Sequence, residues 1–322
     1  MNLDLIYNWL GSFGYTENQI RYLQEQRVEN PDGSLNGHKV ASENLFKLIP
    51  FNSFRNKTLS VDISATSLIK KLFSKYVDDD TLVITTGSEH GSVRQELQKC
   101  KNVISPICHG KLRNDIDINS ACKPFKKAFI YMIALSVGDN HYLYNCDVKH
   151  IQEILKSNNI EFVTVLDAVQ ECFLLSRDYS IYDFVVSTAH ALIPEYNMGM
   201  LFGTDKMGCD YACNWISAFI TKLDLLFENK SKLYMFNNIM SQTLSEFTQV
   251  DDNLKDTSRA PFVYNLADYK KRLSGLNDIE VEKGGVEPPD YTPVTFRAIP
   301  FLLQQKKFFD RLKAIDFILR NG

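Results

Sequence analysis

A carboxylate, a hydroxyl and an imidazole occur where two apolar segments in the middle of the chain end. Asp167 directly follows the apolar residues 161–166, and Thr188 and His190 close the next such segment, which begins at Asp183. An aspartate that follows an apolar strand is placed at the ligand-binding edge of a parallel sheet. Groups of these types can move protons or bind ligands. The spacing therefore predicts a site for chemistry at that edge.

Short apolar, β-branched segments alternate with segments of helical pattern through the middle of the chain. The segments that predict strands are residues 81–86, 102–107, 128–137, 161–166, 183–188 and 198–202. The segments that predict helices are residues 92–101, 147–158, 213–227 and 304–319, with Asp147 as the N-cap of the second. Strands that alternate with helices favour a mostly parallel sheet with helices on both faces. The predicted fold class is therefore α/β.

The length of the chain, 322 residues, allows one large domain and a smaller one, each with its own core. We expect residues 51–205 to form the large α/β domain. Residues 206–322, with a strand at 292–299, are expected to form a smaller α+β domain. The segment 1–50 is expected to pack on this small domain.

Composition and charge indicate which classes of partner the protein is not expected to bind. The formal net charge of −3 disfavours a strongly basic surface, so we expect no nucleic-acid partner. No apolar segment approaches the roughly 18 residues that a membrane span needs, and Asp4 stands where a signal peptide is basic. The seven cysteines are odd in number and scattered, unlike a disulfide framework. We therefore expect a cytoplasmic protein without a membrane partner.

Four motifs, in order, resemble those of a known enzyme family. They are the run from Ile84 to Val93 with His90, the D-A-V-Q at Asp167 to Gln170, the S-T-A-H at Ser187 to His190, and a strand that starts with Gly199. Together they resemble the class V aminotransferase and cysteine-desulfurase branch of the pyridoxal-phosphate (PLP) enzymes of fold type I. The resemblance spans about residues 60 to 320. It implies the PLP fold of type I and PLP as the cofactor.

The resemblance also implies roles for single residues. Asp167 would pair with the pyridine nitrogen of PLP, and His90 would stack on the ring and serve catalysis. Gln170 would contact the ring oxygen, while Thr188 and His190 would contact the phosphate.

Three further matches to the family rest on shorter motifs. Ser64 and Thr66 resemble the phosphate turn before a helix, and a helix N-terminus with hydroxyls suits a phosphate. Thr243 would correspond to a hydroxyl that reaches the phosphate of a neighbouring subunit. Arg297 would bind the carboxylate of an amino-acid-like substrate, a task for which a planar guanidinium is suited. The resemblance implies a homodimer with the site at its interface.

The sequence departs from the family at the residue that binds PLP covalently. Where the family has a lysine after the histidine, this chain has Ala191. Lysine there acts as nucleophile and then as acid and base, and alanine can do neither. Ala191 is either an engineered substitution in an active enzyme, which we favour, or a natural loss. In addition, no cysteine follows Cys213, so a persulfide-forming desulfurase is disfavoured.

We therefore expect a PLP-dependent transferase or lyase that acts on an amino acid or an amine. A natural pseudoenzyme that binds PLP, a PLP adduct or a partner is the first alternative. A doubly wound enzyme with another cofactor is the second, although no glycine-rich nucleotide motif occurs. A metal-dependent enzyme that uses His90, His190 and Asp167 is the third, and Cys209 with Cys213 is too few ligands to close a zinc site. Asp167, His90 and Arg297, taken singly, also fit ordinary structural roles.

Overall fold

The computed structural model describes the sheet-forming part of the chain and several elements after it. The described residues are 52–54, 56–62, 64–108, 111–136, 141–169, 171, 177–188, 198–207, 230–243, 280–281, 294–295 and 305–321. The predicted segment 1–50 and the predicted helix 213–227 lie outside them.

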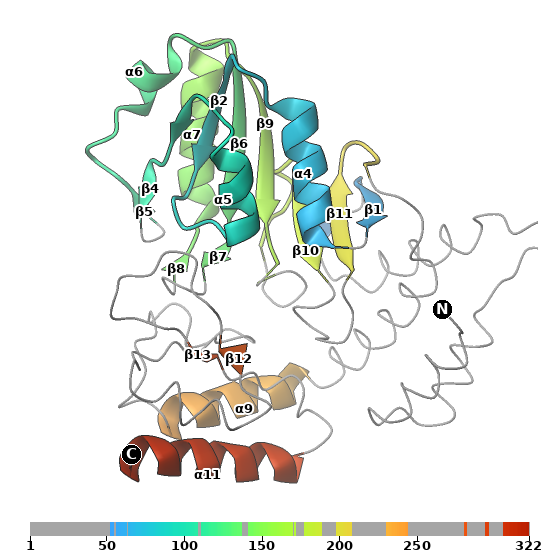
Figure 1. The fold of residues 1–322 in the computed structure, drawn as a ribbon, viewed down its shortest axis with the longest axis vertical. Helices are drawn as coiled ribbons and strands as arrows, with labels where there is room; N and C mark the ends of the chain where they lie inside the picture. Colours follow the sequence, from blue (N-terminus) through green and yellow to red (C-terminus); the bar gives the residue numbers. More distant parts are fainter. Residues whose placement is uncertain are drawn as a thin grey trace, which may run out of the picture.

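A seven-stranded sheet forms the centre of the described part (Figure 1). Its strands, in order across the sheet, are β1 (Thr58–Asp62), β11 (Gly199–Gly203), β10 (Phe184–Thr188), β9 (Glu161–Asp167), β6 (Lys127–Ile133), β2 (Thr81–Thr85) and β3 (Val103–Ile104). β11 runs antiparallel to both of its neighbours, and all other adjacent strands pair in parallel. The carboxyl ends of all strands except β11 therefore meet at one edge. This confirms the predicted mostly parallel α/β sheet.

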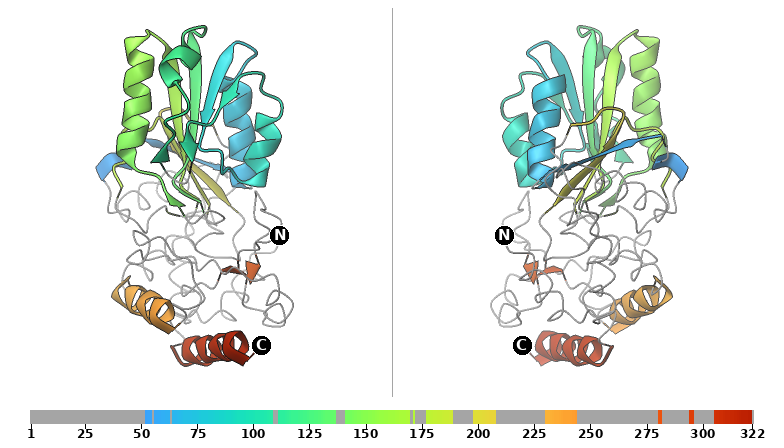
Figure 2. Two further views of the ribbon diagram at one scale, coloured as in Figure 1. Left: turned by 90° about the vertical axis from the view of Figure 1, so that its left-hand side faces the viewer. Right: turned by 90° about the vertical axis from the view of Figure 1, so that its right-hand side faces the viewer.

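Helices cover both faces of the sheet, as Figures 1 and 2 show. α4 (Ala65–Tyr76) and α5 (Gly91–Leu97) lie on one face. α7 (Asn145–Ser157) lies on the other face and contacts the short α6 (Ile118–Cys122). Because both faces are covered, the central strands are mostly apolar, which is why they form nearly continuous apolar runs in the sequence.

A core cluster of buried residues lies between the sheet and α4. Every residue of β2 and of β10 is buried. The apolar side chains of α4 recur at the three- and four-residue spacing of one helix face, and those buried are Leu68, Ile69, Leu72 and Phe73. The ring of Phe73 contacts the ring of Phe129 on β6 edge to face, with 5.0 Å between their centres. This packing fixes α4 against the sheet, and with it the start of α4 at the sheet edge.

The remaining described elements are short strand pairs, one turn and two helices. The pairs are β4 (Ile107–Cys108) with β5 (Lys111–Leu112), β7 (Leu135–Ser136) with β8 (His141–Tyr142), and β12 (Glu280–Val281) with β13 (Val294–Thr295). The 3₁₀ turn η1 covers Asn52–Phe54, and the helices are α9 (Lys230–Thr243) and α11 (Gln305–Asn321). Figures 1 and 2 show α9 and α11 beyond the carboxyl edge of the sheet. α11 confirms the predicted final helix, and β13 falls within the predicted late strand.

Four predicted boundaries are wrong. The predicted helix 92–101 ends at Leu97. The predicted strand 102–107 is two strands in different sheets, because Pro106 between them has no N–H for a ladder. The predicted strand 128–137 ends at Ile133, after which the chain turns to form β7. Asp147 is not the N-cap of its helix. α7 begins two residues earlier, after Tyr144, and Asp147 lies in its first turn.

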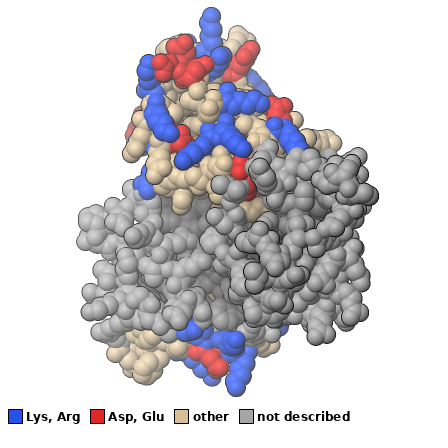
Figure 3. All heavy atoms as spheres, turned by 45° about the vertical axis from the view of Figure 1, so that its right-hand side comes forward, with Lys and Arg blue, Asp and Glu red and all other residues tan. Residues whose placement is uncertain are grey.

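Charged side chains of both signs are mixed on the face of the molecule drawn in Figure 3. Several of them form exposed ion pairs, such as Lys75 with Asp205 at 2.9 Å. Exposed pairs of this kind contribute little to stability, typically about 0–1 kcal/mol. Among the described helices, none combines the length and the apolar character that a membrane crossing requires.

Candidate functional site

Side chains from four strands come together at the carboxyl edge of the sheet, which faces downward in Figure 1. Asp167 is the last residue of β9, and Thr188 is the last residue of β10. Ser64 follows β1 and His90 follows β2, each at the start of a helix. Four of the residues predicted from the sequence thus lie at one edge, because parallel strands present their carboxyl ends together.

The carboxylate of Asp167 is buried and held by two donors. The Tyr131 hydroxyl on β6 donates to Oδ2 at 2.8 Å, and the Val169 N–H donates to Oδ1 at 3.2 Å. Burial raises the pKa of Asp167, while the two hydrogen bonds and an electrostatic interaction with His90 act in the opposite direction. Each carboxylate oxygen has a second lone pair, so Asp167 can also accept from a ligand.

Tyr131 is a member of this site that the sequence analysis missed. Its side chain is fully buried in the sheet. Burial first, and then the charge of Asp167, keep the pKa of its hydroxyl well above the usual range. The hydroxyl therefore stays protonated and acts as a donor to Asp167. A hydroxyl-bearing ring inside an otherwise apolar strand was the available sequence signal.

His90 is exposed and caps α5. Its Nδ1 accepts from the Ser92 N–H at 3.2 Å and lies 2.9 Å from the Ser92 hydroxyl. Because a backbone N–H can only donate, Nδ1 is the acceptor in this bond. Capping is a structural role that needs no ligand. It also fixes the ring at the sheet edge, close enough for the electrostatic interaction with Asp167.

The loop before His90 closes around a buried carboxylate. Oε1 of Glu89 accepts from the Thr86 N–H at 2.6 Å, the Thr86 hydroxyl at 2.7 Å and the Gly87 N–H at 3.0 Å. Gly87 has a φ of +80°, a conformation that glycine adopts readily. Burial raises the pKa of Glu89, and the three hydrogen bonds oppose that rise. Glu89 thereby sets the path of the chain that carries His90.

The start of α4 touches the sheet at Gly199. The hydroxyl of Ser64 caps α4 by accepting from the Ser67 N–H at 3.2 Å. A Cβ on Gly199 would lie 2.3 Å from the carbonyl carbon of Ser64 and 2.4 Å from the nitrogen of Ala65. Only a glycine permits this approach. It brings the positive end of the helix, with Thr66 half-buried in the first turn, to the carboxyl edge.

Thr188 lies beside this contact, since it is the register partner of Gly199. Its hydroxyl donates to the carbonyl of Met198 at 2.9 Å. Contact with an anion as a donor therefore requires that the hydroxyl rotate away from this carbonyl. A negative side chain is also close, because Oδ2 of Asp62 accepts from the Ser67 hydroxyl at 3.0 Å and from Lys71 at 2.6 Å. Lys71 offsets that charge beside the helix start.

Several predicted residues lie outside the described part of the chain: Gln170, His190, Ala191 and Arg297. Thr243 is described as the last residue of α9, where its carbonyl accepts from Arg320 of α11 at 3.5 Å. Its predicted contact with the phosphate of a neighbouring subunit stays a prediction. Within the described residues, no group of three or more His, Cys, Asp or Glu side chains could hold a metal ion.

Comparisons with known proteins show which solved structures have a similar fold. No protein-family model matches the chain, and no curated protein matches its sequence. A solved NifS-like protein is similar in structure at a TM-score of 0.65 and 14% identity, over 93% of this chain and 95% of that one. The apo cysteine desulfurase from Thermococcus onnurineus NA1 is similar at 0.66 and 12% identity, over 94% of this chain and 92% of that one.

A third similar structure is a lysine-to-alanine variant of serine palmitoyltransferase from S. paucimobilis with bound PLP and myriocin. Its TM-score is 0.61 at 10% identity, over 95% of this chain and 86% of that one. At such identities the likeness shows a shared fold. The chain therefore has the α/β fold of the type I PLP enzymes, with a mostly parallel sheet flanked by helices.

Proposed function

We propose that the chain is a PLP-dependent transferase or lyase that acts on an amino acid or an amine. The observation that carries the proposal is the buried carboxylate of Asp167 at the carboxyl end of β9, held by Tyr131 with His90 nearby. Fold alone does not imply function, so the proposal rests on this site together with the likeness to PLP-binding structures.

The described residues fit the cofactor at both of its ends. Burial disfavours the charged form of Asp167, so a cationic partner is favoured, and a protonated pyridine nitrogen is such a partner. The start of α4, which Gly199 admits to the sheet edge, provides N–H groups and the hydroxyls of Ser64 and Thr66 for a phosphate. When bound, PLP supplies a ring that withdraws electrons from a substrate attached to it.

Each residue then has a definite task. The carboxylate of Asp167 accepts a hydrogen bond from the protonated pyridine nitrogen. The hydroxyl of Tyr131 donates to Asp167 and holds it in place. His90 presents its ring from the start of α5. The phosphate is bound by Ser64, Thr66, Thr188 and His190. Thr243 of a second subunit in a homodimer also contacts it. Gln170 contacts the ring oxygen of PLP, and Arg297 binds the carboxylate of the substrate.

Ala191 decides between two versions of this function. An alanine cannot bind the cofactor covalently or move a proton. In the version that we favour, Ala191 replaces the lysine of an active enzyme. The alternative, which Ala191 itself supports, is a protein that naturally binds PLP or a PLP adduct without turnover.

The test compares the chain as given with Ala191→Lys, each with added PLP. We expect both to bind PLP. After borohydride treatment, only Ala191→Lys should retain one pyridoxyl group by mass spectrometry. In either background, Asp167→Asn should weaken PLP binding by about ten- to a hundredfold, because a hydrogen bond between charged groups is lost.

Each other outcome rejects a specific part of the proposal. If neither form binds PLP, the cofactor assignment is wrong. If both bind it and Ala191→Lys remains unlabelled, position 191 is not the attachment site, and the non-catalytic alternative replaces the enzyme. If Asp167→Asn binds PLP as tightly as its parent, Asp167 has another role.

A further inference from the structure

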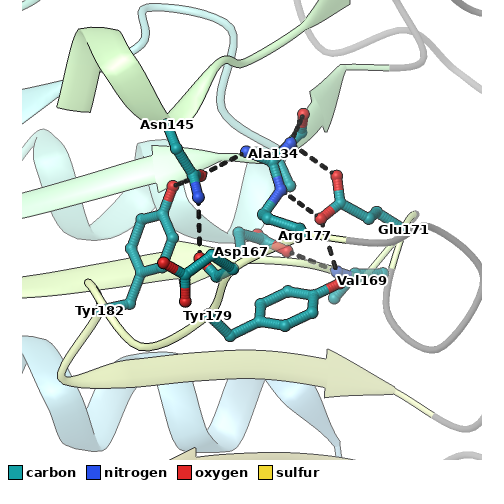
Figure 4. Close-up of polar contacts among 9 residues, drawn as sticks. Ala134, Asn145, Asp167, Val169, Glu171, Arg177, Tyr179 and Tyr182 are labelled. Atoms are coloured by element: carbon teal, nitrogen blue, oxygen red, sulfur yellow. Dashed lines mark hydrogen bonds and ion pairs between the residues drawn. The ribbon is translucent and has the colours of Figure 1, made fainter. Parts of the chain in front are cut away.

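A buried ion pair joins Glu171, four residues after Asp167, to Arg177 in the segment before β10. Nε of Arg177 donates to Oε1 of Glu171 at 2.5 Å, and Nη2 donates to Oε2 at 2.7 Å. The side chains are 1% and 0% exposed, respectively. Figure 4 shows the guanidinium of Arg177 against the carboxylate of Glu171 in this two-point arrangement. The function proposed above assigns no task to this pair.

The guanidinium is satisfied on its other sides as well. Nη1 of Arg177 donates to the side-chain oxygen of Asn145 at 2.9 Å, at the start of α7. Nη2 also lies 3.5 Å from the carbonyl of Ala134, and the guanidinium sits 4.3 Å from the centre of the Tyr142 ring. Burial alone would lower the pKa of Arg177, but the charge and hydrogen bonds of Glu171 more than offset this and raise it. Arg177 therefore stays charged.

Two tyrosines complete the network. The hydroxyl of Tyr179 donates to Oε1 of Glu171 at 3.2 Å, and the hydroxyl of Tyr182 donates to the side-chain oxygen of Asn145 at 2.8 Å. Both rings are buried (Figure 4). The pair thus joins the turn after β9, the segment that leads into β10 and the start of α7.

Backbone hydrogen bonds connect this network to Asp167. The Glu171 N–H donates to the carbonyl of Ala168 at 3.1 Å, which closes a turn that begins directly after Asp167. Ala134, whose carbonyl lies at the guanidinium, donates its own N–H to the carbonyl of Asp167 at 2.9 Å. Inside the turn, the Val169 N–H donates to the carboxylate of Asp167. The turn is therefore held at both of its ends.

An ion pair is a costly way to fill a core. Removing two charges from water offsets much of their attraction, and apolar side chains of the same size stabilise a core as well or better. What the pair supplies instead is a fixed orientation of the segments that it joins. Its hydrogen bonds fix the separation and orientation of the segments they join, because a guanidinium and a carboxylate align in a plane.

We infer that Glu171 and Arg177 form a positioning pair for the cofactor site. They hold the turn from Asp167 to Glu171 so that the Val169 N–H stays on the Asp167 carboxylate and the carboxylate stays directed at the sheet edge. The role toward PLP rests on the function proposed above, whereas the role in holding the turn does not.

The test removes both charges at once, in Glu171→Leu/Arg177→Met, so that no unpaired charge is left buried. The matched control is Glu96→Gln/Lys99→Met, which removes a pair of 2.7 Å at the end of α5 in which Glu96 is also buried. Two quantities are measured on variants whose circular dichroism shows them folded. They are amide hydrogen exchange in the peptide 166–171 and the Kd for PLP.

In Glu171→Leu/Arg177→Met we expect exchange in this peptide to be about tenfold faster and PLP binding to be about 10- to 100-fold weaker, since small displacements of a positioned group have large effects. The control should leave both unchanged. Unchanged exchange in the folded variant would overturn the inference. Faster exchange with an unchanged Kd would leave a purely structural pair and overturn the positioning role.

Failure of the proposed function gives a different result. If the parent chain does not bind PLP, that proposal is wrong, and hydrogen exchange alone decides whether the pair holds the turn. If the double variant does not fold, Arg177→Lys takes its place, because the ammonium keeps the charge opposite Glu171 but cannot make the two parallel hydrogen bonds of a guanidinium. The same two measurements and the same criteria then apply.

Discussion

Two carboxylates, Glu89 and Asp167, are buried at the same edge of the sheet. Glu89 is held by donors from its own loop, and Asp167 by the Tyr131 hydroxyl on β6 and the Val169 N–H. Tyr131 interacts electrostatically with both. Burying a charge is costly unless hydrogen bonds or a counter-charge compensate it. In Glu89 three hydrogen bonds supply the compensation and shape the loop. In Asp167 two hydrogen bonds do so, and a lone pair on each oxygen remains for a ligand.

The raised pKa of Glu89 gives a testable dependence of stability on pH. A carboxyl whose folded pKa lies above its ordinary value of 4.5 contributes stability that is fully present below that value. This contribution is lost as the pH rises through the folded pKa. Glutamine does not ionise, so Glu89→Gln cannot lose stability in this way. We therefore expect the free energy of unfolding of the parent to fall relative to Glu89→Gln as the pH rises from about 4.5.

Urea denaturation at a series of pH values measures this difference. Asp117→Asn is a control of opposite sign, because hydrogen bonds from Ser120 lower the pKa of Asp117. Its contribution is present above the ordinary value of 3.8 and is lost only as the pH falls below it. A difference between the parent and Glu89→Gln that does not change with pH would contradict the account of Glu89.

At the scale of elements, the site depends on how closely α4 approaches the sheet. Gly199 opens β11 and is the register partner of both Asp62 on β1 and Thr188 on β10. The absence of a side chain at that point lets the backbone at Ser64 rest on the sheet. The contact links a strand pairing to the place where a phosphate would bind.

Gly199→Ala should therefore displace the start of α4. The new Cβ would meet backbone atoms 2.3 Å away, which cannot rotate aside. We expect a loss of about 1–3 kcal/mol of unfolding free energy, as is usual for overpacking, and weaker binding of PLP. Urea denaturation and the Kd for PLP measure the two effects.

Gly203→Ala, at the far end of the same strand, is the matched control. Its Cβ would lie 2.2 Å from the buried ring of Phe184, so we also expect it to destabilise the protein. Because Gly203 lies at the other edge of the sheet, the affinity for PLP should not change. Equal losses of PLP affinity in both variants would show that the contact of Gly199 with α4 has no specific role.

At the scale of the whole molecule, a second apolar contact lies outside the sheet. The buried rings of Phe236 on α9 and Phe308 on α11 stack with 4.0 Å between their centres. These helices belong to the region that we propose as the smaller domain, residues 206–322. Their packing, together with the β12–β13 strand pair, is what the described residues define of that region.

Phe308→Ala should destabilise this helix pair by about 3–5 kcal/mol, the usual cost of removing a buried aromatic ring. Phe317→Ala on the same helix is the control, because that ring is 66% exposed and its loss should change stability by no more than about 0.5 kcal/mol. Thermal unfolding followed by circular dichroism compares the two. Similar midpoints for both variants would mean that the stacked rings do not stabilise the pair.

The sequence by itself determined every strand of the central sheet except β1, the alternation of strands and helices, and the position of Asp167 and Thr188 at strand ends. These features are local, since a strand buried on both faces must be apolar and the first polar residue after it marks its end. The shared edge then follows from the rule that such strands run parallel. Boundaries were less certain where a single residue such as Pro106 redirected the chain.

Only the tertiary structure decided which groups meet at that edge. Tyr131 and Asp167 are 36 residues apart, and their hydrogen bond exists because β6 and β9 are neighbours. Gly199 meets Ser64 because β11 inserts in reverse between β1 and β10. Neighbouring strands are chosen by the packing of the whole sheet, which no short stretch of sequence specifies. For that reason the sequence could indicate the chemistry of the site but not the contacts that hold it in place.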